Sequence, residues 1–226
     1  MSEKKKGVAS AKKAPARAKR KADQVLVLMQ KRYPAPETHL QARGPWELLV
    51  ATVLAAQCTD ARVNMVTPGL FARWPDPASL AGAEIEELEA CIRSTGFYHS
   101  KAKHLLGAAK RVRDVYKGQV PGSMAELITL PGVARKTANV VLWESFGINE
   151  GIAVDTHVGR IAYRLGLAST RDPQRTEQEL MLLFPREEWG DVNHRLVWFG
   201  RDVCDARKPL CEKCELADFC DKRDVK

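Results

Sequence analysis

The stretch from Leu130 to Leu142 reads LPGVARKTANVVL, and it determines the fold that we expect. Pro131 and Gly132 form a tight turn, and apolar residues on both sides of it can pack two short helices against each other. The turn leaves free backbone N–H groups at the start of the second helix, which suits them to bind an anion such as phosphate. A plain pair of packed helices is the alternative interpretation.

Two cations, Arg135 and Lys136, occupy the first turn of that second helix, where backbone dipoles already concentrate positive charge. The helix end, Arg135 and desolvation all disfavour the ammonium form of Lys136. The neutral amine is the nucleophile that attacks a carbonyl or a sugar carbon C1′ to give a Schiff base. We therefore expect a chemical role for Lys136; a solvated lysine that touches phosphate is the alternative.

A carboxylate, Asp155, stands directly before an amphipathic helix in the segment IAVDTHVGRIAYRLGL, residues 152–167. As an N-cap it would accept backbone N–H bonds, which is a sufficient structural reason for its presence. The same carboxylate could stabilise a developing oxocarbenium ion and take part in proton transfer. Spacing alone does not choose between the two roles.

Four of the six cysteines, Cys204, Cys211, Cys214 and Cys220, lie near the C-terminal end with the spacing C-x6-C-x2-C-x5-C. Thiolates at this density indicate a metal centre, either zinc or an iron–sulfur cluster. Structural zinc usually uses two short C-x2-C pairs, and only one such pair is present. The spacing therefore favours one 4Fe–4S cluster.

The loop between the first two of these cysteines, DARKPL, carries Arg207 and Lys208. A metal centre at its ends would hold the two cations rigidly toward a phosphate chain, whereas in a free surface loop they would mean little. The other two cysteines, Cys58 and Cys91, lie in apolar helical contexts and are expected to be ordinary buried thiols.

The net charge of +8 resides in residues 1–22, which hold nine Lys or Arg residues and one Glu, so the remaining chain is neutral. This stretch is expected to be a disordered tail, either a solubilising leader or a loose electrostatic tether for polyanions. Nucleic-acid binding by the folded part therefore does not follow from charge alone.

The composition, 45% apolar and 28% charged, is typical of a soluble globular protein. Apolar stretches such as residues 48–56 are far shorter than the roughly 20 residues that a bilayer requires. No secretory apolar region follows the start, so we expect a cytoplasmic, nucleoid-associated protein without a membrane partner.

Helical periodicity runs through the rest of the chain, and alternating patterns are scarce, so we expect an all-α fold. Helices are expected to start at Pro45, at Thr59 or Asp60, at Ser100 and at Ser123.

Three motifs, LPGVARKTANVV, VDTHVGR and the four-cysteine spacing, together resemble the endonuclease III family. Its members are bifunctional DNA glycosylase/AP lyases of the helix-hairpin-helix superfamily. The resemblance runs from about residue 23 to residue 220. It implies a two-lobed all-α fold, with a six-helix barrel at residues 40–149 and an iron–sulfur lobe formed by residues 23–39 and 150–226.

The resemblance also implies how the protein acts. Duplex DNA with a damaged pyrimidine or an abasic site would lie bent across the cleft of a monomer, with the damaged base turned out. Lys136 would be the Schiff-base nucleophile and Asp155 the catalytic carboxylate. The expected activity is removal of an oxidised pyrimidine, followed by β-elimination that cleaves the strand 3′ to the lesion.

Several residues would contact the DNA by the same resemblance. Gln57 would fill the space left by the extruded base, Phe97 would wedge into the duplex, and His157 would face the DNA near Asp155. The full set expected to contact DNA is Gln57, Phe97, Gly132, Ala134, Arg135, Thr137, His157, Arg207 and Lys208.

Two positions depart from the family pattern. Phe97 stands where the family commonly has an aliphatic wedge, and this departure bears on the contact with the orphaned base and on the preferred lesion. Ala134 stands where the usual hairpin has a second glycine; a helix start with negative φ tolerates alanine, so we expect a weaker grip on DNA but no loss of function.

Two other functions compete with this one. An adenine-mismatch glycosylase resembles the family in hairpin and cluster but normally lacks the lysine. A catalytically silent binding module or a redox sensor would keep Lys136 and Asp155 only as supports.

Overall fold

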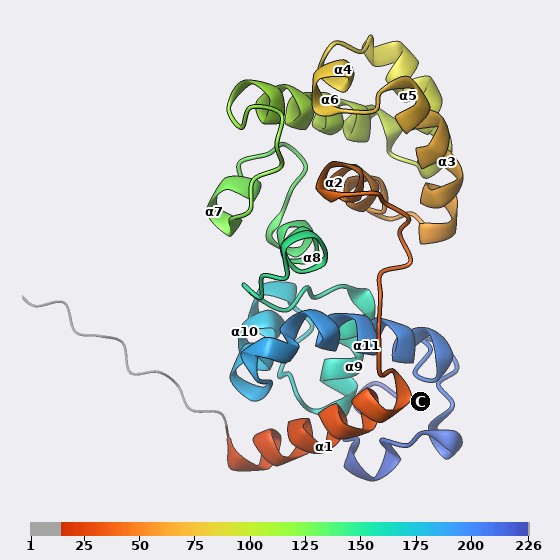
Figure 1. Ribbon diagram of the computed structural model, residues 1–226. Helices are drawn as coiled ribbons and strands as arrows, with labels where there is room; N and C mark the ends of the chain where they lie inside the picture. Colours follow the sequence, from red (N-terminus) through yellow and green to blue (C-terminus); the bar gives the residue numbers. More distant parts are fainter. Residues whose placement is uncertain (1–14, 226) are drawn as a thin grey trace, which may run out of the picture.

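The computed structural model describes residues 15–225, and these form helices, turns and loops without any strand. Two separate hydrophobic cores divide the helices into two lobes, which are stacked in Figure 1. The all-α, two-lobed fold predicted from the sequence is confirmed in this part of the chain. No helix in it combines the length and the apolar character needed to cross a membrane.

The first lobe contains the helices from α2 to α8. They are α2 (Pro45–Leu54), α3 (Asp60–Arg73), α4 (Pro77–Ala81), α5 (Ile85–Ile92), α6 (Tyr98–Asp114), α7 (Met124–Leu127) and α8 (Arg135–Phe146), with a 3-10 turn η1 (Arg93–Thr95) before α6. Pro45 occupies the first turn of α2, and the Thr59 and Ser123 side chains cap α3 and α7, as predicted.

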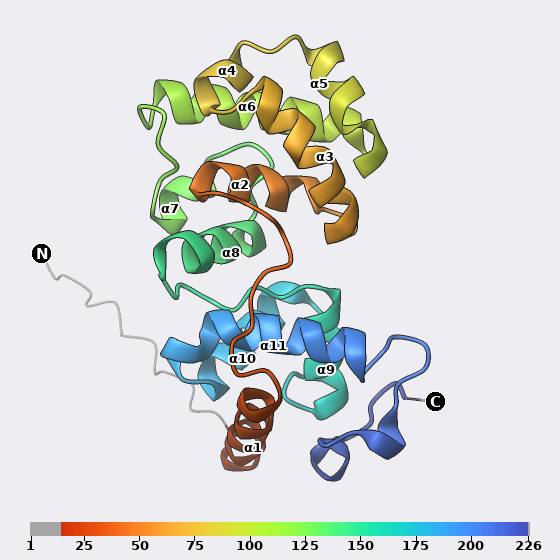
Figure 2. The same cartoon turned by 45° about the vertical axis from the view of Figure 1, so that its right-hand side comes forward.

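The second lobe combines the N-terminal helix with the C-terminal ones. It contains α1 (Ala16–Arg32), α9 (Thr156–Leu165), α10 (Pro173–Leu183), α11 (Trp189–Asp202) and the 3-10 turns η2 (Arg186–Glu188), η3 (Cys211–Lys213) and η4 (Ala217–Phe219). The chain leaves this core after Tyr33 and returns to it at Ile152. Figure 2 shows α1 against the C-terminal helices, on the side away from the first lobe.

The predicted extent of the disordered tail, residues 1–22, is wrong at its C-terminal end. Helix α1 begins at Ala16, and Ala22 is fully buried in the second core. Lys21 donates to the Leu165 carbonyl at 2.6 Å and pairs with Asp221 at 2.5 Å, so its charge is neutralised within the fold. Residues 1–14 lie outside the described part, and their role stays a prediction.

The start of α6 also differs from the expectation. The helix begins at Tyr98, not after Ser100, because Gly96 and Phe97 both adopt positive φ angles of 72° and 49° and end the preceding turn earlier. Phe97 is therefore the residue before the helix, and it lies at the tip of a tight turn.

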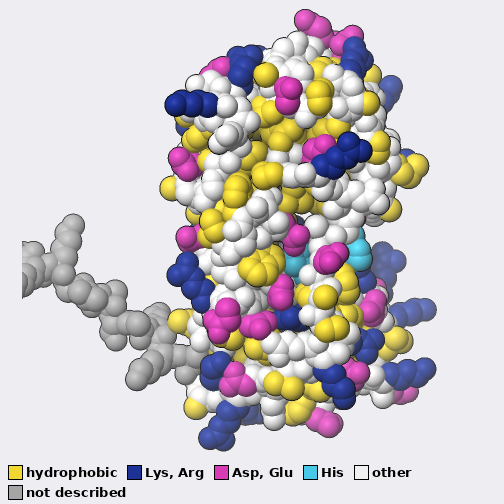
Figure 3. All heavy atoms as spheres, in the orientation of Figure 1, with side chains coloured by type: hydrophobic (Ala, Val, Ile, Leu, Met, Phe, Trp, Pro, Cys, Tyr) yellow, Lys and Arg dark blue, Asp and Glu magenta, His cyan; other side chains and the backbone are white. Residues whose placement is uncertain are grey.

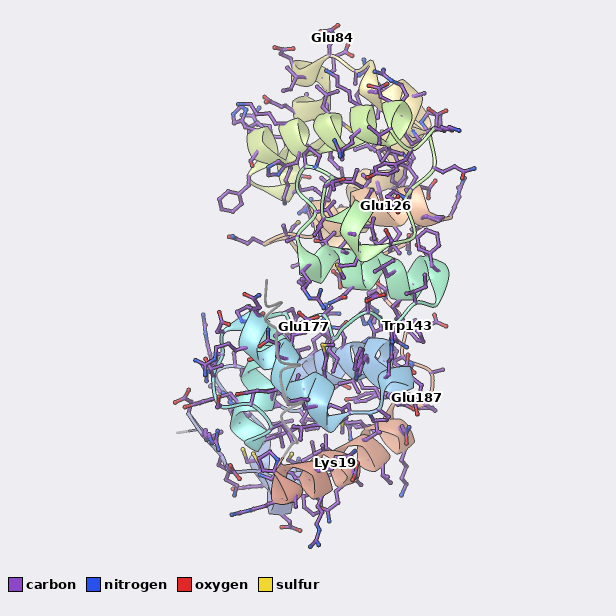
Figure 4. The ribbon with its side chains drawn as sticks, turned by 90° about the vertical axis from the view of Figure 1, so that its left-hand side faces the viewer. Lys19, Glu84, Glu126, Trp143, Glu177 and Glu187 are labelled. Atoms are coloured by element: carbon purple, nitrogen blue, oxygen red, sulfur yellow. The ribbon has the colours of Figure 1, made fainter. Side chains whose placement is uncertain are left out.

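The two lobes meet where α8 packs against α11. Gly190 lies so close to Trp143 that a Cβ atom at residue 190 would overlap the indole ring. His194 Nε2 and Glu144 Oε1 pair at 2.5 Å beside this contact, and the Gly190 N–H donates to Asn149 Oδ1 at 2.9 Å. Figure 4 shows Trp143 and Glu177 at the level of this seam.

Gly190→Ala is expected to lower the free energy of unfolding by about 2–3 kcal/mol, because the added methyl group overpacks the contact with Trp143. Urea unfolding followed by circular dichroism measures the change. The matched control is Gly69→Ala at an exposed position of α3, where a Cβ meets no atom within 4 Å and stability should rise by up to about 1 kcal/mol. Equal stabilities for the two variants would contradict the tight seam.

Candidate functional site

The turn between α7 and α8 has the geometry expected of an anion-binding hairpin. Gly132 has a φ of +79°, and a Cβ there would lie 2.8 Å from His104 Cβ, so glycine suits both the conformation and the space. Ala134 precedes α8 with a φ of −85°, which alanine tolerates, and no side chain caps this helix. The first N–H groups of α8 are therefore available to a ligand.

Lys136 and Asp155 line the same pocket, of about 190 Å³, although they come from different lobes. Its walls include Thr52 and Ala55 from the first lobe and Trp198 from α11. Figure 3 shows histidine side chains in the narrow region between the lobes. Lys136 itself is exposed, so the protein alone does not desolvate it, contrary to our expectation.

Asp155 is the N-cap of α9, as predicted. Its Oδ1 atom accepts the backbone N–H groups of His157 and Val158, both at 2.8 Å. No hydrogen bond to Oδ2 is found within residues 15–225. The capping role therefore uses one carboxylate oxygen, and the half-buried side chain keeps the other for the pocket that Lys136 also lines.

His157 follows Asp155 and connects the site to the C-terminal cysteine segment. Burial lowers the pKa of His157, and the neighbouring Asp155 carboxylate opposes this shift. Arg160 Nη2 lies 3.1 Å from His157 Nδ1 and also donates to the carbonyls of Gly200 and Cys204 at 3.1 and 3.0 Å. A neutral imidazole that accepts from the guanidinium fits both observations.

Gln57 and Phe97 share an unusual backbone conformation. Both are exposed, and both have positive φ angles, 53° for Gln57 and 49° for Phe97. Non-glycine residues in this region are uncommon, and they cluster at active sites, ligand clamps and switch regions. Phe97 is 66% exposed, which is high for a large aromatic residue.

The four C-terminal cysteines line one cavity of the second lobe. Among residues 15–225, no group of three or more His, Cys, Asp or Glu side chains has a geometry that would hold a single metal ion. Arg164 Nη1 donates to Cys204 Sγ at 3.3 Å, and its buried Nε has no partner. This donor set fits a group that itself carries acceptor atoms, as the sulfides of a cluster do.

Arg207 and Lys208 lie exposed in the loop after Cys204. Their backbone N–H groups both donate to Asp205 Oδ1, at 2.8 and 2.9 Å, and these bonds lower the pKa of Asp205. The loop is therefore shaped by its own carboxylate, and the two cations stand on its outer side.

Comparisons with known proteins identify the family of this chain. Residues 50–186 match the model of the HhH-GPD superfamily of base excision DNA repair proteins, and residues 204–220 match the iron–sulfur binding domain of endonuclease III. An endonuclease III of Synechocystis sp. is 50% identical over 202 residues, which cover 89% of this chain and 92% of the relative. The chain belongs to the endonuclease III family.

Other relatives agree with this assignment. The endonuclease III of Bacillus subtilis is 44% identical over 86% of this chain and 90% of its own length. The solved structure of a non-covalent endonuclease III–DNA complex aligns with a TM-score of 0.86 and 43% identity, covering 90% of this chain and 95% of that chain. A trapped endonuclease III–DNA covalent intermediate aligns with the same TM-score and identity, covering 96% of that chain.

One interaction of this endonuclease III family chain was not predicted. Glu177, only 5% exposed, accepts from Arg135 Nε and from Asn139 Nδ2, both at 2.8 Å, and so joins α10 to α8. The guanidinium of Arg135, a residue expected to contact DNA, is engaged in this ion pair, while 45% of its side chain stays exposed. The sequence pattern that could have indicated this ion pair is an acidic residue on the buried face of α10, next to Thr176 and one turn before Leu180.

Proposed function

We propose that this chain removes oxidised pyrimidines from duplex DNA and then cleaves the strand at the abasic site. The observation that carries the proposal is that Lys136 and Asp155 line one pocket between the lobes, with Lys136 in the first turn of the helix that follows the hairpin. Endonuclease III relatives that are bound covalently or non-covalently to DNA support the same reaction.

The chemistry uses the amine twice. Lys136 Nζ forms a bond to the sugar carbon C1′ as the bond from C1′ to the base breaks, and the base leaves with a proton. Ring opening gives an imine, with the proton of the amine passing to O4′. The imine acidifies C2′; loss of a C2′ proton then expels the 3′ phosphate by β-elimination.

Asp155 supports both steps. Its carboxylate faces the developing positive charge at C1′ during base departure, and it is placed to exchange protons with the sugar or the amine. The cap bonds to Oδ1 fix the direction of this carboxylate.

We infer that the DNA lies across the seam, with its backbone on the α8 hairpin. The hairpin N–H groups bind phosphate, and Gln57 and Phe97 enter the duplex from the first lobe. The residues proposed to contact DNA are Gln57, Phe97, Gly132, Ala134, Arg135, Thr137, His157, Arg207 and Lys208. Because all of them come from one chain, a monomer suffices, and its substrate places it at the nucleoid.

We propose that the iron–sulfur group is one 4Fe–4S cluster, held by Cys204, Cys211, Cys214 and Cys220. When bound, the cluster supplies a cross-link between these four positions and takes no part in hydrolysis. Because Cys204 and Cys211 flank the loop at residues 205–210, binding of the cluster would fix both ends of the loop and so orient Arg207 and Lys208 toward a phosphate.

Lys136→Gln is expected to abolish covalent capture of the protein on abasic duplex DNA by borohydride, with a loss of roughly 1,000-fold or more, because no amine remains to form the imine. Denaturing gels measure the trapped species. Lys110→Gln, at an exposed position of α6, is the matched control and should trap like the wild type. Persistent trapping by Lys136→Gln would contradict the role of Lys136 as nucleophile. Strong DNA binding by the wild type without any strand cleavage would favour a binding module.

Asp155→Asn separates the cap from the chemistry, since asparagine also caps helices but carries no charge. We expect the thermal midpoint to change little while base removal falls roughly 100-fold. Single-turnover cleavage of a thymine-glycol duplex and thermal melting give the two readouts. Unchanged cleavage would leave Asp155 with the capping role alone.

Metal analysis of the purified protein should find about four iron and four acid-labile sulfide per chain, and the solution should be brown. Cys220→Ser is expected to lose most of this iron, whereas Cys91→Ser, at a cysteine of α5 outside the cavity, should retain it. Stoichiometric zinc in a colourless protein would contradict the cluster assignment.

A further inference from the structure

A buried lysine of α6 has no role in the chemistry described above. Lys101 is only 4% exposed, and its Nζ donates to the backbone carbonyls of Leu54 and Thr95, each at 2.8 Å. Burial lowers the pKa of Lys101. None of the ion pairs found within residues 15–225 involves the Lys101 ammonium. A buried cation without a counter-ion is costly unless its N–H groups are hydrogen-bonded, so the two carbonyl partners of Lys101 define its structural use.

The two carbonyls lie at the C-terminal ends of two helical elements, where a positive charge is favourable. Leu54 is the last residue of α2, and Thr95 is the last residue of η1. Carbonyl groups at the end of a helix lack intrahelical partners and carry the negative end of the helix dipole. The Lys101 ammonium therefore caps both elements at once and joins their backbones through one atom.

Each capped end leads directly into one of the residues proposed to enter DNA. Gln57 follows Leu54 by three residues, and Phe97 follows Thr95 by two. Both stand in the strained positive-φ region, which persists only where the surroundings hold the backbone in place. Lys101 supplies that support to both loops, and α6 itself starts at the residue after Phe97.

We propose that Lys101 is a positioning residue that fixes the separation between the Gln57 loop and the Phe97 loop, so that both side chains enter the duplex at the same lesion. This inference rests on the proposed function of those two residues. Lys101 touches neither the DNA nor the reacting atoms. Its effect on base removal passes entirely through the geometry of the two loops.

The test uses Lys101→Met, which keeps the length of the side chain but cannot donate to either carbonyl. The probe is a duplex with a tetrahydrofuran abasic analogue opposite 2-aminopurine, whose fluorescence rises when the base is unstacked. At saturating protein, the rise is expected to fall at least about threefold in Lys101→Met. Lys110→Met removes the same charge from an exposed position of α6 and should give the wild-type rise. Lys101→Arg keeps a cationic donor and should restore part of the signal.

The fluorescence at saturation distinguishes positioning from mere stability, which thermal melting measures separately. A wild-type rise in folded Lys101→Met overturns the inference. If Lys101→Met does not fold by circular dichroism, Lys101→Gln, which keeps one donor group, is read in the same assay. Absence of any fluorescence rise with the wild type would also overturn the inference. Removal of thymine glycol by the wild type is measured separately, and it tests the proposed function independently of the inference.

Discussion

The contact between Trp143 and Gly190 sets the position of one lobe against the other, and the candidate site depends on it. Lys136 belongs to the same helix as Trp143, two turns earlier, whereas Asp155 belongs to the lobe that contains Gly190. Without a Cβ on Gly190, α8 and α11 approach until the indole lies on the backbone. The amine and the carboxylate therefore line one pocket only while this contact is kept.

Polar pairs around this contact make the docking of the lobes specific. Glu177 binds both Arg135 and Asn139, and His194 pairs with Glu144, each across the same seam. A shifted arrangement would leave a buried charged group without its partner, which costs far more than the pairs contribute when they are made. Apolar contacts alone would allow the lobes to slide, and the polar pairs oppose that motion.

Features that depend on neighbouring residues could be predicted from the sequence, and features that depend on distant ones could not. The hairpin turn and the Asp155 cap each depend on residues only a few positions apart. The pairing of Arg135 with Glu177 spans 42 residues and leaves no local trace. Residues 16–22 read as part of a charged tail because the carbonyl of Leu165 and the carboxylate of Asp221, which bind Lys21, lie far along the chain. Lys101 likewise resembles any lysine of an amphipathic helix until its two carbonyl partners are known.

Helix α1 is synthesised before all of the segments against which it packs. Its buried face, with Val25 and Met29, packs only on elements after residue 150, and Lys19 bonds to the carbonyl of Leu183. During synthesis the first lobe has its whole core, Leu40 to Leu142, before α9 leaves the ribosome. During translation the apolar face of α1 therefore stays without its partners until the segments after residue 150 have been synthesised, and only then can the second lobe close.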